Sequence, residues 1–115
     1  MDARTLLQTL EATIVWMPDA PPALSAGYAS DLLSDVMANA PADSVLITVQ
    51  AHLNAIAVCT LVGAHCLLAC NSRPLPDDMV EAARREGIAV GVTAMNQFHT
   101  SWRVHTLLHG NGAQS

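Results

Sequence analysis

The chain has 115 residues, of which 51% are hydrophobic but only 3% aromatic, so we expect a single domain with an aliphatic core. Its net charge of −5 argues against nucleic acid as a partner, because binding a phosphate backbone needs clustered positive charge. All five basic residues are arginines, which excludes chemistry that depends on a lysine, such as Schiff-base formation or a phosphate-binding loop.

The N-terminal part of the chain predicts a helix, a strand and an irregular connection. Leucines recur at helical spacing over residues 3–10, which predicts a short helix. Residues 13–17, Thr-Ile-Val-Trp-Met, are rich in the side chains typical of a strand. Three prolines in residues 18–26 stop either kind of regular structure.

A second helix and a second strand follow. We expect the helix to begin at Ser30 and Asp31, whose side-chain oxygens can accept hydrogen bonds from free backbone N–H groups, and to end near residue 39. Residues 44–49 form a near-continuous apolar run. Strands of this kind are usually covered on both faces, as in parallel sheets.

The middle of the chain continues the alternation of helices and strands. The predicted helix over residues 53–62 is apolar almost all round, which indicates burial against the sheet on one side and against another subunit on the other. Residues 66–70 predict the next buried strand. Residues 76–86 predict a surface helix, with acidic side chains in its first turn that complement the helix dipole.

The last two elements are a strand and a helix. Residues 88–92 form the last apolar run that predicts a strand. Asn96 suits the N-cap of a final helix. We expect this helix to bury Phe98, Trp102 and His105 against the rest of the domain.

Together these elements predict an α/β fold, a small parallel sheet of about four strands with helices on both faces and right-handed crossovers. We expect one domain over residues 1–115. The fold depends on the apolar segments 44–49, 65–70 and 88–92 lying side by side in the same direction, so that the turns after them converge. No apolar run is long enough to span a membrane, and residues 1–10 lack a signal-peptide layout, so we expect a cytoplasmic protein.

The segment GYASDLLSDVMANA, residues 27–40, resembles the DRTGG domain family. Shorter similarities extend the resemblance to residue 108 and lie at 46–48, 76–78 and 87–90. The resemblance implies a MurF-like α/β fold and a regulatory or ligand-sensing role, as in the N-terminal domain of HPr kinase/phosphorylase and the regulatory segment of phosphate acetyltransferase. Free-standing members tend to be encoded beside redox and hydrogenase genes, which implies a redox-enzyme partner.

The chain departs from the motif that names this family. Residues 49–52, Val-Gln-Ala-His, stand where an Asp-Arg pair follows a strand in the family. Residues 70–72, Cys-Asn-Ser, stand where the family has a Thr-Gly-Gly run. Both segments nevertheless follow neighbouring predicted strands.

Ligands of open α/β sheets collect outside the carboxyl ends of the strands. Here these ends carry amide, hydroxyl and imidazole groups, joined by the guanidinium of Arg73, which suit a small polar or nucleotide-like ligand. The predicted ligand-binding residues are Gln50, His52, Asn54, Asn71, Ser72, Thr93 and Asn96. Helix starts near this edge add free N–H groups for an anion. The alternative is that these residues only cap helices and form turns.

Two pairs at four-residue spacing are open to a chemical and a structural interpretation. Asp31 and Asp35 have the spacing of an acid/base pair on a helix, but capping and solvation of the helix is the favoured interpretation. His105 and His109 have a spacing that can hold a metal, but no third ligand is near in sequence, so we expect no metal.

The three cysteines are expected to be buried free thiols. Cys66 and Cys70 would share a face of one strand about 13 Å apart, too far for a disulfide. The sequence holds no kinase or other catalytic motif, so we expect a non-catalytic protein without a cofactor. A homodimeric interaction or scaffold subunit of a redox enzyme system is the alternative function, and weak catalysis by His52 a minor one.

Overall fold

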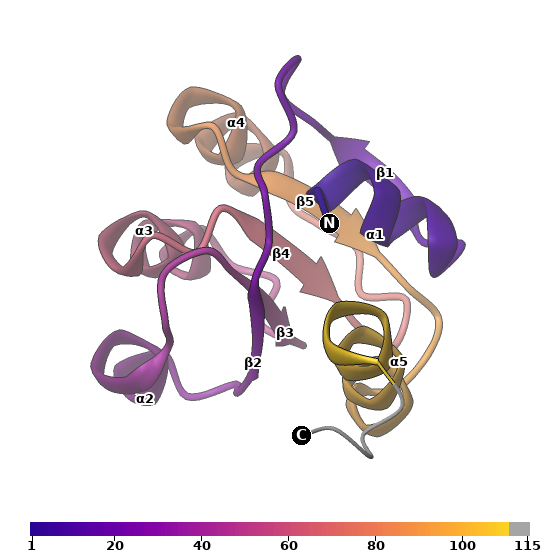
Figure 1. Cartoon of the computed structure of the whole chain (residues 1–115). Coiled ribbons are helices and arrows are strands. Elements are labelled where there is room, and N and C mark those ends of the chain that lie inside the picture. Colours follow the sequence, from indigo (N-terminus) through magenta and orange to yellow (C-terminus); the bar gives the residue numbers. More distant parts are fainter. Residues whose placement is uncertain (111–115) are drawn as a thin grey trace.

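A five-stranded sheet forms the centre of the molecule, with strand order β1-β5-β4-β3-β2 (Figure 1). The strands are β1 Thr13–Trp16, β2 Ala26–Ala29, β3 Ser44–Thr48, β4 Cys66–Ala69 and β5 Ala89–Val92. Strands β2 to β5 are parallel neighbours, and β1 pairs antiparallel with β5 at the edge. The structure, a computed structural model, describes residues 1–110. It confirms the α/β fold class and the side-by-side parallel arrangement of the three apolar segments.

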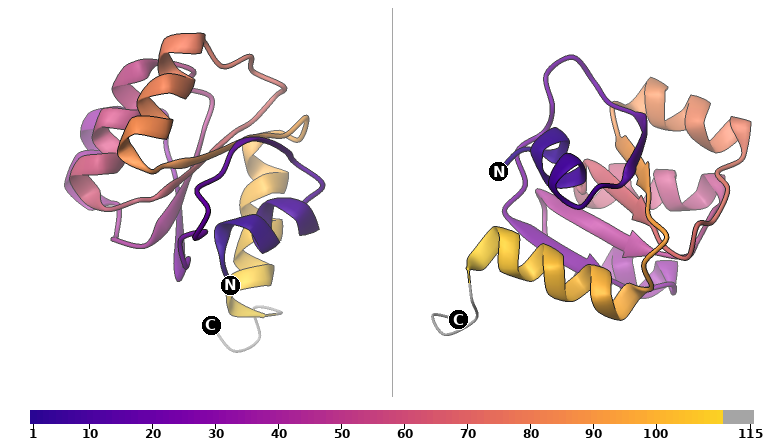
Figure 2. Two further views of the ribbon diagram at one scale, coloured as in Figure 1. Left: turned by 90° about the horizontal axis from the view of Figure 1, so that it is seen from above. Right: turned by 90° about the vertical axis from the view of Figure 1, so that its right-hand side faces the viewer.

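Helices cover both faces of the sheet (Figure 2). They are α1 Ala3–Thr9, α2 Leu33–Asn39, α3 Leu53–Val62, α4 Asp77–Glu86 and α5 Gln97–His109. Helices α2, α3 and α4 connect successive parallel strands and lie together on one face, because each such connection takes the same right-handed turn. Helices α1 and α5 lie on the opposite face. None of the helices in residues 1–110 is long and apolar enough to cross a membrane.

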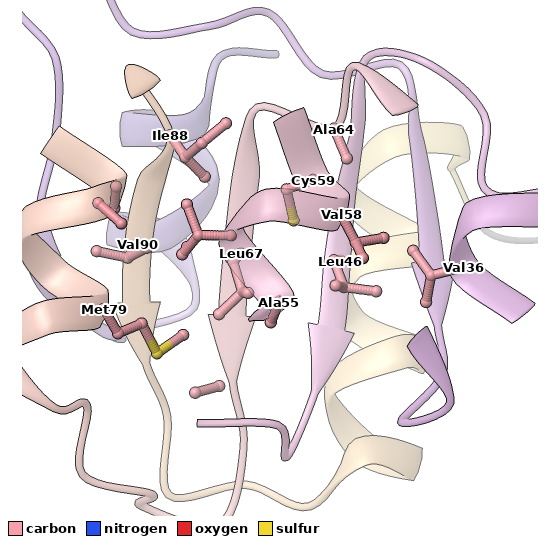
Figure 3. Close-up of a cluster of buried hydrophobic side chains, with 14 residues drawn as sticks. Val36, Leu46, Ala55, Val58, Cys59, Ala64, Leu67, Met79, Ile88 and Val90 are labelled. Atoms are coloured by element: carbon pink, nitrogen blue, oxygen red, sulfur yellow. The ribbon is translucent and has the colours of Figure 1, made fainter. Parts of the chain in front are cut away.

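Alternation along the buried strands gives each face its own core. In β4, Leu67 packs towards α3 and α4 with Leu46 and Val90, as Figure 3 shows, whereas Leu68 belongs to the core under α1 and α5. Every residue of β3 and β4 is buried. Two-sided burial therefore explains why these strands are apolar without interruption.

The short strand β2 was not predicted; it lies between the predicted connection, which ends at residue 26, and the predicted helix start at Ser30. Its sequence, Ala-Gly-Tyr-Ala, lacks the β-branched residues that favour strands, and its conformation is set by pairing with β3. A Cβ atom at Gly27 would lie 3.3 Å from Val104 Cγ1, so the glycine allows α5 to approach the sheet closely. The predicted sheet had about four strands, one fewer than the five observed.

Two helix predictions need correction. Helix α2 begins at Leu33 rather than at Ser30 and Asp31, which lie in the loop before it. On α5, Phe98 is 80% exposed, Trp102 is 63% exposed and His105 is also exposed, so the prediction that these three are buried is wrong. The sheet is instead contacted by the smaller side chains of the opposite helix face, among which Thr100 and Val104 are buried.

Candidate functional site

The carboxyl ends of β2, β3, β4 and β5 lie at one edge of the sheet because the four strands are parallel. Backbone hydrogen bonds continue the sheet into the loops after them. The N–H of Cys70 donates to the carbonyl of Thr48, and the N–H groups of Asn71 and Ser72 donate to the carbonyls of Met95 and Thr93. The predicted convergence of these loops at one edge is therefore confirmed.

Asp31 links three segments at this edge. Its Oδ1 accepts hydrogen bonds from Thr48 Oγ1 at 2.9 Å, from the N–H of Val49 at 2.8 Å and from Gln97 Nε2 at 3.1 Å. The carbonyl of Asp31 also accepts from Gln50 Nε2 at 2.8 Å. The carboxylate thus joins the ends of β2 and β3 to the start of α5, a role that differs from the predicted helix cap.

Four of the predicted site residues use their side chains in hydrogen bonds within the protein. His52 Nδ1 accepts from the N–H of Asn54, and Asn96 Oδ1 accepts from the N–H of His99, so both cap helices. Thr93 is buried, and its Oγ1 accepts from the N–H of Met95. Gln50 Nε2 donates to the carbonyl of Asp31, 19 residues away. The capping and turn alternative therefore describes the bonds of His52, Thr93 and Asn96, whereas Gln50 joins two loops.

The other three predicted residues, together with Arg73, present exposed side chains. Asn71 and Ser72 adopt left-handed backbone conformations, with φ of 60° and 53°. Such conformations are uncommon for residues other than glycine, more so for serine than for asparagine, and they cluster at functional sites. Glu11 and Asp43 also adopt them, each as a single residue elsewhere in the chain. The side chains of Asn54, Asn71, Ser72 and Arg73 form no hydrogen bond or ion pair within residues 1–110.

Three hollows are present on the described surface, and the first reaches the carboxyl end of β2 at Ala29. One lies between β2 and α5, another beside Leu24 and His65, and a third between α3 and α4. None of the three is lined by Gln50, His52 or Asn71. The predicted site is therefore an open rim rather than one of these hollows.

The carboxylates of Asp31 and Asp35 have separate partners. Tyr28 donates its hydroxyl to Asp35 Oδ2 at 2.8 Å, and Asn39 Nδ2 donates to Asp35 Oδ1 at 2.9 Å. The bond from Tyr28, followed by that from Asn39, lowers the pKa of the Asp35 carboxyl, and the same bond raises the pKa of the Tyr28 hydroxyl. An acid/base pair made of the two aspartates is thus not formed.

Tyr28→Phe is expected to destabilise the protein at neutral pH by an amount that shrinks as pH falls. The lowered pKa of Asp35 adds stability that is fully present above the unfolded-state value of about 3.9 and is lost as pH drops through the folded-state pKa. At strongly alkaline pH, above its raised pKa, the Tyr28 hydroxyl loses the proton that it donates, so the same bond is lost there too. Urea midpoints of both proteins between about pH 3 and pH 7 measure the difference. A difference that stays constant over this range contradicts the assignment.

The remaining reactive groups are buried or few. All three cysteines are free and buried, and burial raises the pKa of the Cys59 thiol to about 12 and also raises that of Cys66. Residues 1–110 contain no cluster of three or more His, Cys, Asp or Glu side chains placed to hold a metal ion. His105 and His109 of α5 lie with ring centroids 4.8 Å apart, and both line the hollow between β2 and α5.

Comparison with known proteins adds no assignment. No model of a known protein family matches the chain, and no curated protein is significantly similar to it. The DRTGG resemblance therefore stays a prediction from the sequence.

Proposed function

We propose that the protein is a non-catalytic regulatory module of the DRTGG type that binds a small polar or anionic ligand. The binding surface is the strand-end rim, which we define as His52, Asn54, Asn71, Ser72 and Arg73. The observation that carries the proposal is the pair of left-handed residues Asn71 and Ser72. This strained turn holds an amide, a hydroxyl and the following guanidinium in solvent without partners in residues 1–110.

The charges around the rim favour binding of an anionic group beside Arg73 and the start of α3. Asp31 places a carboxylate at the ends of β2 and β3, which disfavours an anion there. Arg73 is the basic residue of the rim, and the start of α3 adds the positive end of a helix dipole next to His52. Asp77 and Asp78 begin α4 close by in the chain. This mixture suits a ligand that places one anionic group beside Arg73 and the start of α3 and directs hydroxyl or amide groups to the rest of the rim.

The groups of the rim are suited to binding rather than to chemistry. His52 Nδ1 is occupied by the N–H of Asn54, so the imidazole has only Nε2 left for a ligand. The thiols offer no nucleophile for this histidine to activate, because the three cysteines are buried and burial raises the pKa of each. Ser72 lies in a different loop, and no hydrogen bond within residues 1–110 joins it to His52.

A thermal-shift screen with nucleotides, sugar phosphates and small carboxylates tests the proposal. A ligand present at about 100 times its Kd is expected to stabilise the protein by about 2.7 kcal/mol, which raises the Tm by several degrees. Arg73→Ala should reduce the shift, whereas the matched control Arg84→Ala, an exposed arginine of α4, should leave it unchanged. An absence of any shift across the panel, or an equal loss in both variants, contradicts the proposal.

A second candidate function is that of an interaction or scaffold subunit, either as a homodimer or docked on a redox enzyme. The specific observation in its favour is large apolar side chains left exposed on two helices. Leu61 on α3 is 72% exposed and overlies a groove shared with α4, and Phe98 and Trp102 are exposed on α5. Light scattering of the purified protein tests the homodimer, which a monomer at every concentration would exclude.

A further inference from the structure

The outer face of α5 carries a row of four aromatic and imidazole side chains. We call Phe98, Trp102, His105 and His109 the α5 row; all four are exposed. His105 and His109 lie at the border of this face, where they also line the hollow between β2 and α5. The opposite face of the helix, with Thr100 and Val104, packs on the sheet. Figure 2 shows α5 at the margin of the molecule, with no other element covering its outer side.

Leaving this row in solvent is costly for the isolated chain. The protein has only four aromatic residues of the Phe, Trp and Tyr types, and two of them lie in the row. Phe98 is 80% exposed and Trp102 is 63% exposed, although burial of such side chains is among the largest hydrophobic gains a protein can make. An exposed concentration of this kind marks an interaction surface.

The spacing of the row fits a second helix as the element that covers it. Successive members are separated by four, three and four residues, which is the a/d repeat of two packed helices. In an antiparallel pair, a positions of one helix face d positions of the other. One antiparallel register then places Trp102 against His105 of a second copy and Phe98 against His109 of a second copy, each twice about the two-fold axis.

The charge of the helix also favours a second copy over a charged partner. Residues 97–109 contain no acidic side chain to attract a basic partner. Arg103, which would attract an acidic one, is directed to α1, where its Nη2 donates to the carbonyl of Thr9 at 3.3 Å. The row itself has only aromatic rings and imidazoles, which stack well on one another.

We propose that a second copy of this chain docks antiparallel along α5 through the α5 row. This inference rests on the second candidate function and names the surface that it uses. A helix of 13 residues is about 20 Å long, so one helix pair buries less than the ~1,200 Å² of a standard stable interface. The dimer is therefore a weak one, with a Kd in the micromolar range.

Sedimentation equilibrium of the full chain over about 1 to 200 µM tests this arrangement. Wild type is expected to dimerise with concentration, and Trp102→Ala to raise the dimer Kd at least about tenfold, as loss of a central aromatic anchor does. Trp102 is exposed, so the variant should keep its fold, which circular dichroism checks. The matched control is Leu61→Ala on α3, which should dimerise like wild type.

A mixing experiment tests the register. Trp102→Lys and His105→Glu should each weaken self-association, whereas an equimolar mixture should form heterodimers, because lysine then faces glutamate in one of the two central layers. A dimer that Trp102→Ala leaves intact and Leu61→Ala disrupts overturns the α5 proposal while the interaction function stands. A wild type that is monomeric up to about 200 µM overturns both.

Discussion

Asp31→Ala is expected to lower the free energy of unfolding by about 3 kcal/mol, more than any other change at the sheet edge. The substitution removes the acceptor of three hydrogen bonds, from Thr48 Oγ1, the N–H of Val49 and Gln97 Nε2. These donors are part-buried, so water replaces the lost carboxylate only incompletely. Bonds to an ionised acceptor contribute more than neutral ones, and a donor left unsatisfied adds its own desolvation cost.

Two further variants separate the bonds from the charge. All three donors meet the same oxygen, so Asp31→Asn can keep Oδ1 in place and should cost about 1 kcal/mol, the share that depends on ionisation. Asp19→Ala removes an exposed carboxylate and should change stability by less than about 0.5 kcal/mol. Urea denaturation measures all three. If Asp31→Ala is no worse than Asp19→Ala, the carboxylate does not hold the edge together.

Elements with a strong local pattern were predictable. β3 and β4 are uninterrupted apolar runs, and buried parallel strands require such runs. α3 and α4 both end at a glycine with positive φ, Gly63 and Gly87, where a side chain would be strained. In each case residues close together in the sequence specify the element, so the parallel pairing of β3, β4 and β5 followed from them, whereas the antiparallel pairing of β1 with β5 was not predicted.

β2 and the role of Asp31 depend on contacts distant in the sequence. The ladder to β3 makes Ala-Gly-Tyr-Ala a strand, against its local preference. Asp31 stands before a helix, where a cap is the usual role, but its donors lie 17, 18 and 66 residues further along the chain. Asp31 lies two residues after β2, and because this strand was itself not predictable, no local signal pointed to the role of the carboxylate.

The orientation of α5 was not predictable from residue type. Size and apolarity suggested that Phe98 and Trp102 face the core, yet Thr100 and Val104 do so. Val104 of α5 packs tightly on β2 at Gly27, where even an added Cβ atom would lie 3.3 Å from it. A large ring does not fit at that position of the helix, and this steric limit is set by the sheet rather than by the helix.

Leu67→Ala is expected to lower the free energy of unfolding by about 3.5 kcal/mol and the Tm by about 15 °C. Leu67 lies in the central strand β4, paired with Leu46 on one side and Val90 on the other, and is fully buried. Figure 3 shows it between the sheet and the helices that cover this face. The cavity is expected to stay open, because neighbours such as Ala55 already bring the helix backbone close.

Leu61→Ala is the matched control for this change, since it removes the same atoms from a side chain that is 72% exposed on α3. It should change stability by less than about 0.5 kcal/mol. Thermal and urea unfolding measure the stability of both variants. At low protein concentration, where the chain does not self-associate, the difference between them reflects the burial of the leucine side chain alone. The total stability of a domain is about 5–15 kcal/mol, so the loss at Leu67 is a large part of it. Equal losses in the two variants would mean that the central strand is not the centre of the core, and the placement of every loop at the sheet edge would lose its support.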